Sequence, residues 1–259
     1  IDLAPARIAL ITMLSLFRRW HIRRLLNQPL SPDRAQWLKA SIAAHQRLDD
    51  PMRRRLEQIV AVMLARCHWE ACEGLVLRDE MRTRIAGHAA VMLLGAKDYY
   101  FDSVSVILVF PGVIRRRDQS RQSPTVGEAW SNGGVVLSWA EVERIGTDGN
   151  AHNVVIHEFA HHLDGRDGEM GGSIPFSSTA DQADWTRVAA IEYEQLLEDV
   201  QRRRATVFDP YGATNQAEFF AVASEAFFEQ PNRTRYHHQD LFDLLTKFYQ
   251  IDPRAWNDH

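Results

Sequence analysis

The sequence predicts a helix-rich α+β fold with a small mixed β-sheet at its centre. Three observations support this prediction. Apolar residues recur at helical spacing through about the first ninety residues. Two short segments rich in β-branched residues follow, at 104–110 and 135–139. Helical patterns then occupy most of the remaining chain, and such segregation of helices and strands is typical of α+β proteins.

Helix-start signals divide the N-terminal part of the chain. Ser31-Pro32-Asp33 offers a capping side chain followed by proline at the first helical position. Asp50-Pro51 repeats this signal, and Asp79 is the cap candidate for a third helix that we expect to end at Gly95. After the strands, the patterns predict helices at about 181–204, 215–230 and 239–250.

Length and composition limit the classes of protein that this chain can be. With 259 residues, 45% of them hydrophobic, it can bury one large core. We therefore predict one domain over 29–259, preceded by an N-terminal helical arm over 1–28. The net charge of −4 argues against direct binding to nucleic acid.

The remaining sequence signals predict a cytoplasmic protein without a membrane segment. The apolar run from Ile8 to Phe17 is too short to span a bilayer, and Arg18-Arg19 follow it where a signal peptide would need small residues. Cys67 and Cys72 lie on different faces of an expected helix, so we expect free thiols in a reducing compartment.

The most informative motif is His157-Glu158-Phe159-Ala160-His161. On a helix, positions i and i+4 lie on one face, so both imidazoles can bind one Zn²⁺. The intervening Glu158 can then act as general base toward a water on the metal. The surrounding residues are largely apolar, which predicts a buried helix. Its expected boundaries are capping candidates at 148–150 and Gly165 at the end.

Catalytic zinc usually takes three protein ligands, and four acidic residues compete for the third place. Asp167 would complete an extended motif, but the required glycine arrives one residue late. Asp164 lies a turn beyond His161 and is better suited to orient a ligand ring. Glu218 and Glu225 share one face of a very apolar helix, so both need polar partners. Composition does not separate these last two.

A resemblance bears on that choice. The segment from His157 to Asp164, followed by 211–221 (Tyr-Gly-Ala-Thr-Asn-Gln-Ala-Glu-Phe-Phe-Ala), resembles the Mlc titration factor A family of bacterial zinc metallopeptidases. The same two motifs are similar to the catalytic domain of anthrax lethal factor. The resemblance implies a zincin-like metallopeptidase fold around the HExxH helix. It implies Glu218 as the third zinc ligand beside His157 and His161, and Tyr211 as a catalytic residue that lines the site.

Two functions follow as expectations. The first is a zinc-dependent peptidase that hydrolyses peptide or protein substrates with Glu158 as general base, and the resemblance implies aminopeptidase activity. The second, also implied by the resemblance, is regulation of sugar uptake through binding of the Mlc transcription repressor, with little or no proteolysis. A helical scaffold with an accidental motif is the third possibility, and it would carry no stoichiometric metal.

Overall fold

The computed structural model describes residues 22, 24–97, 99–112, 133–147, 151–164 and 171–256. Within these ranges the chain forms helices α2 (Pro32–Ser41), α3 (Asp50–Arg66), α4 (Asp79–Val91), α6 (Trp139–Arg144), α7 (Val154–Asp164), α8 (Thr179–Gln201), α9 (Gln216–Glu229), α10 (Pro231–His237) and α11 (Gln239–Tyr249). Short 3-10 helices are η1 (Ala43–Gln46), η3 (Pro210–Thr214) and η4 (Pro253–Trp256). The strands are β1 (His68–Ala71), β2 (Val106–Phe110) and β3 (Gly134–Ser138). This is the helix-rich α+β fold that the sequence predicts.

The sheet is parallel rather than mixed, which corrects the sequence-based expectation. The strand order is β1-β2-β3, and both pairs run parallel, with His68 opposite Val106 and Val106 opposite Gly134. Parallel neighbours need long crossover connections, and the chain supplies one through α4 between β1 and β2. The hydrophobic pattern identifies buried strands but does not encode their relative direction, so the mixed arrangement was a wrong inference.

β1 lies in the part of the chain that was expected to be wholly helical. It is short and mostly exposed, so it shows no alternation of apolar and polar residues. Cys67 is the C-cap of α3, and Cys72 follows β1 directly. The two cysteines therefore flank a strand instead of sharing a helix, although both are free, as predicted.

Helices begin close to the three start signals of the N-terminal half, but two of the three caps lie one residue earlier than predicted. The side chain of Ser31 accepts a hydrogen bond from the N–H of Arg34 at the start of α2. Asp49, one residue before the predicted position, caps α3 by accepting from the N–H of Met52. The N-cap of α4 is Arg78 and not Asp79, which is the first residue of the helix; α4 ends at Val91, and turns lead on to Gly95.

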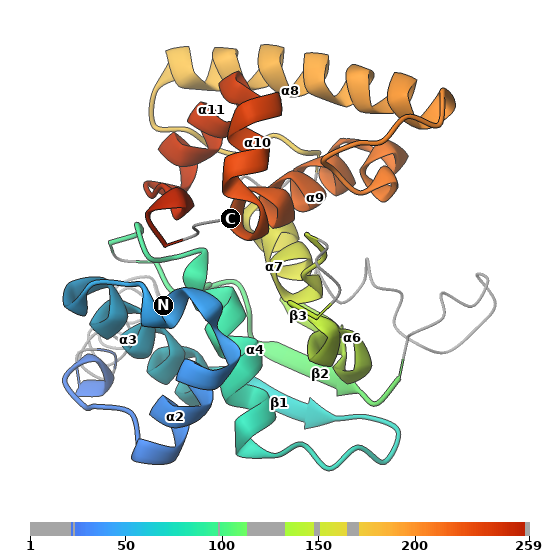
Figure 1. Ribbon diagram of the computed structural model, residues 1–259. Coiled ribbons are helices and arrows are strands. Elements are labelled where there is room, and N and C mark those ends of the chain that lie inside the picture. The colour runs from blue at the N-terminus through green and yellow to red at the C-terminus, as the bar shows by residue number, and fades with distance from the viewer. Residues whose placement is uncertain are drawn as a thin grey trace, which may run out of the picture.

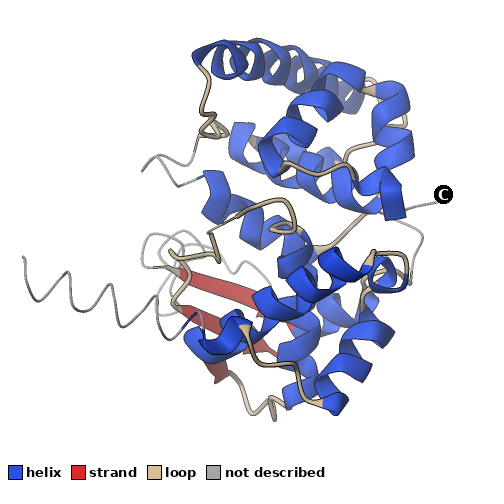
Figure 2. Ribbon diagram, turned by 90° about the vertical axis from the view of Figure 1, so that its left-hand side faces the viewer, coloured by secondary structure: helices blue, strands red, loops and turns tan. Residues whose placement is uncertain are grey.

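α7 lies between the two halves of the molecule (Figure 1). It packs on β3 and α4 on one side and on α9 on the other. The C-terminal helices α8–α11 form an all-helical layer away from the sheet, and Figure 2 shows the strands confined to the opposite half. α7 itself is buried over most of its length, so polar side chains on it must find partners inside the protein.

The N-terminal end of the described chain contacts the same core. Ile22, Leu25 and Leu26 pack against it, and the side chain of Gln58 donates to the carbonyl of Leu26 at 2.9 Å. Among the described helices, none combines the length and the apolar character that crossing a membrane requires.

Candidate metal centre

The start of α7 is set by Asn153. Its Oδ1 accepts a hydrogen bond from the N–H of Ile156 at 3.1 Å, the geometry of an N-cap. The capping candidates at 148–150 lie outside the described residues, as does Gly165. His157 and His161 follow one and two turns later on the face that meets α9.

α9 is fixed in a similar way by the residues in front of it. Asn215 caps the helix by accepting from the N–H of Glu218 at 2.9 Å, so Glu218 stands in the first turn. Gly212 lets the preceding η3 pack closely, since a Cβ there would meet Val222 of α9 at 2.4 Å. Tyr211, in the same turn, therefore comes beside the start of α9.

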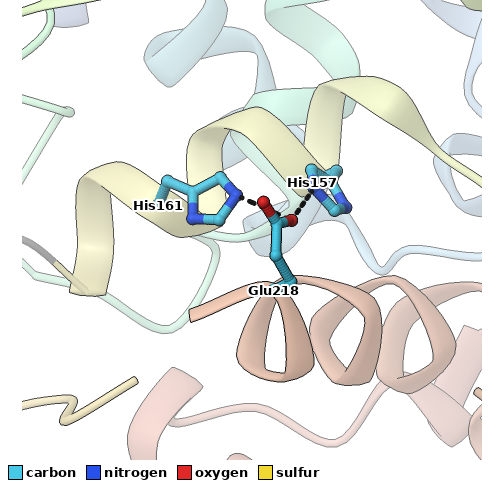
Figure 3. Close-up of side chains that lie close together, drawn as sticks. All are labelled: His157, His161 and Glu218. Atoms are coloured by element: carbon cyan, nitrogen blue, oxygen red, sulfur yellow. Dashed lines mark hydrogen bonds and ion pairs between the residues drawn. The ribbon is translucent and has the colours of Figure 1, made fainter. Parts of the chain in front are cut away.

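Three side chains converge between α7 and α9 (Figure 3). One ligand-type atom from each of His157, His161 and Glu218 lies within 4.8 Å of the others. Oε2 of Glu218 is 2.9 Å from Nε2 of His157 and 3.5 Å from Nε2 of His161. The hydroxyl of Tyr211 donates to Oε1 of the same carboxylate at 3.2 Å. The motif and the resemblance together predicted these four residues as parts of one site, and in the fold they lie close together.

The structure places the two glutamates that composition left equivalent at different edges of the His157 ring. Glu225 lies on the other side of the His157 imidazole, and its Oε1 is 2.8 Å from Nδ1 of that ring. Its Oε2 accepts from the backbone N–H of Asn153 at 2.5 Å and lies 3.0 Å from Nδ1 of His152. Glu225 thus contacts the opposite edge of the imidazole from Glu218, as a residue that orients a metal ligand does.

The pKa values of His157, His161 and Glu218 are shifted by burial and by their mutual contacts. Burial disfavours a charged His157, but the hydrogen bonds that the ring donates to Glu218 and Glu225 outweigh that effect and raise the pKa of the ring to about 10. Burial lowers the pKa of His161, which leaves a neutral imidazole. Burial opposes ionisation of Glu218, yet the two histidines hold the pKa of its carboxyl far below the usual range. One neutral imidazole, one imidazole between two carboxylates and one carboxylate therefore face each other.

Glu158 is the partly exposed member of the motif, while its neighbours on α7 are buried. A cavity of about 250 Å³ opens beside Glu225, between the start of α7, the chain before η3 and the end of α9. His152, Asp209 and Arg233 contribute polar groups to its lining. His152 is therefore a half-exposed residue that contacts Glu225.

The other candidates have different positions. Asp164 is fully buried and accepts a hydrogen bond from the N–H of Gly172 at 2.9 Å, so it ties the end of α7 to the following chain. His162 points to the sheet side, where Nε2 lies 3.1 Å from the carbonyl oxygen of Gly134. Asp167 lies outside the described residues.

Sequence reasoning missed three residues of this region. The side-chain amide of Asn153 donates to Oε1 of Glu229 at 2.6 Å and lies 3.2 Å from Nδ1 of His88. Burial raises the pKa of Glu229 to about 7 and lowers that of His88 to about 3. A signal for Asn153 existed, because asparagine directly before an apolar helical run is a favoured cap. His88 and Glu229 gave none.

Comparison with known proteins agrees with this geometry. The sequence profile of the glucose-regulated metallo-peptidase M90 family matches residues 17–250. An uncharacterized protein of Synechocystis sp. is 33% identical over 248 residues, which cover 90% of this chain and 89% of that protein. Mlc titration factor A of Yersinia pestis and that of Yersinia pseudotuberculosis are each 30% identical over 243 residues, covering 88% of this chain and 89% of theirs. The chain therefore belongs to the M90 family of glucose-regulated metallopeptidases.

Proposed function

We propose that this protein is a zinc-dependent peptidase with His157, His161 and Glu218 as the metal ligands. The observation that carries the proposal is the convergence of three ligand-type atoms within 4.8 Å of one another, from two helices of an M90 chain. Two imidazole nitrogens and one carboxylate oxygen form a donor set that catalytic zinc sites commonly use.

The donor set fits zinc on two further grounds. Nδ1 of His157 faces Glu225, so Nε2 is the nitrogen on the side of Glu218, and a metal that replaced the proton on Nε2 would bind there. The ionised Glu218 offsets part of the charge of a divalent ion in a buried site. A Zn²⁺ held there would act as a Lewis acid and lower the pKa of water toward 7.

The residues of the chain would then divide the proton transfers. Glu158 takes a proton from the attacking water as general base, and it returns that proton to the leaving amine. Its partial exposure on α7 suits this role, because a base must reach both water and substrate. Tyr211 donates a hydrogen bond to the oxyanion that develops on the substrate carbonyl. The contact of its hydroxyl with Glu218 supports this role, since it holds the donor beside the ligands.

The test combines metal analysis with peptide cleavage. We expect purified protein to hold zinc at one equivalent and to cleave peptides until a chelator removes the metal. Glu158→Gln should keep the zinc and lose about 10²–10⁴-fold in rate, the range for a general base. Normal cleavage by that variant, or cleavage that persists without metal, would refute the assignment.

Within the peptidase assignment, we propose aminopeptidase activity and a catalytic domain over 29–259, with 1–28 as a helical arm. Peptides with free and blocked N-termini test the first point, because an aminopeptidase requires the free amine. The domain boundary can be tested by deleting 1–28 and measuring zinc content and cleavage. Free Cys67 and Cys72 are compatible with the cytoplasm as the compartment.

A second candidate function is supported by the names of the Yersinia relatives, which are called Mlc titration factor A. We propose that this chain binds a transcription repressor of that kind as a regulator of sugar uptake, either beside proteolysis or in place of it. Binding of purified Mlc to wild-type protein and to Glu158→Gln distinguishes the functions. Equal binding separates regulation from catalysis, and absence of binding to both excludes the regulatory function.

A further inference from the structure

A fully buried asparagine connects three helices behind the candidate metal centre. Asn153 uses its side-chain oxygen to cap α7 through the N–H of Ile156. Its amino group donates to Oε1 of Glu229 on α9 at 2.6 Å and lies 3.2 Å from Nδ1 of His88 on α4. One side chain thus fixes the start of α7 relative to both neighbouring helices.

The backbone of the same residue leads to the metal centre. The N–H of Asn153 donates to Oε2 of Glu225, whose other oxygen faces Nδ1 of His157. An ionised carboxylate only accepts hydrogen bonds, so Nδ1 carries a proton and Nε2 is the nitrogen turned to Glu218. Two hydrogen bonds therefore connect Asn153 to a proposed ligand.

We propose that Asn153 is a positioning residue of the metal centre, which holds Glu225 and through it the imidazole of His157 in the orientation that presents Nε2 to the ion. The proposal rests on the metal site argued above. Its alternative is that Asn153 merely caps α7. Loss of a cap lowers the stability of the protein, whereas loss of a residue behind a ligand typically changes metal affinity about 10–100-fold.

Two substitutions of Asn153 separate these roles. Asn153→Asp keeps an oxygen that can cap Ile156 but loses the amino group that reaches Glu229 and His88. Asn153→Ala removes both without adding charge. If positioning is the role, both variants bind zinc about 10–100-fold more weakly than wild type. The visible spectrum of Co²⁺-substituted protein should change as well, because it reports the ligand geometry.

A second pair of variants tests the same connection from α9. Glu229→Gln keeps an Oε1 that can accept from Asn153, so its zinc affinity should stay near that of wild type. Glu229→Ala removes the acceptor and should weaken zinc binding. This pair decides the question if Asn153→Ala does not fold, and equal zinc affinity in the two Glu229 variants would overturn the proposal.

Tyr249→Phe is the matched control. It removes another buried hydrogen bond at α9, which the Tyr249 hydroxyl donates to Oγ of Ser224 at 2.8 Å. Ser224 directly precedes Glu225 in the sequence. We expect lower stability with unchanged zinc affinity and Co²⁺ spectrum. If the Asn153 variants bind zinc as wild type does, the positioning role is wrong. If wild type itself binds no zinc, the metal site fails, and this inference fails with it.

Discussion

Two helix–helix contacts in this protein are built on opposite principles. Where α3 meets α4, the buried residues of α3 are all apolar, namely Leu56, Ile59, Val60, Val62 and Met63. Where α7 meets α9, the buried residues include His157, His161, Glu218 and Glu225. Apolar burial at the first contact stabilises the fold directly. Burying ionisable groups at the second costs free energy unless they pair or bind a metal, and this difference points to function at the second contact.

The largest expected effect comes from removing the carboxylate that both imidazoles share. Glu218→Ala should lose zinc and reduce peptide cleavage to background, because two histidines alone leave the metal with one protein ligand fewer than catalytic sites usually have. Elemental analysis and cleavage assays measure this. Glu194→Ala, on the exposed face of α8, is the control and should change neither. Full zinc occupancy in Glu218→Ala would point to Glu225 or Asp167 as the third ligand.

The next prediction concerns the hydroxyl of Tyr211, which donates a hydrogen bond to Glu218 at the α7–α9 contact. Tyr211→Phe should lower kcat about 10²–10³-fold, the range for loss of one oxyanion donor, while zinc content stays the same. Tyr193→Phe is a matched control, because that hydroxyl donates to the backbone carbonyl of Ala213, at 3.4 Å, and not to a proposed ligand. A kcat for Tyr211→Phe within the spread of the control would exclude the catalytic role.

A substitution at the apolar contact between α3 and α4 should lower stability without changing zinc binding. Ile59→Ala at this fully buried position should lower the free energy of unfolding by about 2–5 kcal/mol and leave zinc affinity unchanged. Denaturant unfolding and zinc titration of the folded variant measure the two quantities. Ile59→Val should cost only about 0.5–1.5 kcal/mol. A weaker zinc affinity in folded Ile59→Ala would mean that the two contacts are coupled.

The smallest expected effect concerns pH. Burial, with a lesser contribution from Arg84, lowers the pKa of His88 to about 3 from an ordinary value near 6.5. The unfolded chain therefore binds a proton that the folded protein does not, so stability falls as pH drops below about 6.5. At about 1.4 kcal/mol per pH unit, lowering the pH from 7 to 5 should cost about 2 kcal/mol through His88.

His88→Asn provides the comparison, because its side-chain oxygen can replace Nδ1 as acceptor for Asn153 without titrating. The loss of unfolding free energy between pH 7 and 5 should be about 2 kcal/mol smaller in this variant than in wild type. Equal losses would show that His88 does not remain neutral in the folded protein.

Much of the fold followed from local patterns. Ser31, Asp50 and Asp79 predicted helix starts to within one residue, and the β-branched run at 104–110 predicted the strand that forms over Val106–Phe110, because caps and strand propensity depend on neighbouring residues. The direction of the strands and the existence of β1 did not follow. Strand pairing is a contact between segments far apart in sequence, and four mostly exposed residues carry no periodic signal.

By itself, the sequence determined that two imidazoles share a helix face, that Glu158 stands between them, and that a distant apolar helix carries glutamates in need of partners. These conclusions depend on helical periodicity, which is a local property. Only the tertiary structure decided which edge of His157 each glutamate contacts, and that Asn153, His88 and Glu229 join behind it. Such contacts are set by how α4, α7 and α9 pack in three dimensions, and no spacing along one helix records the position of another.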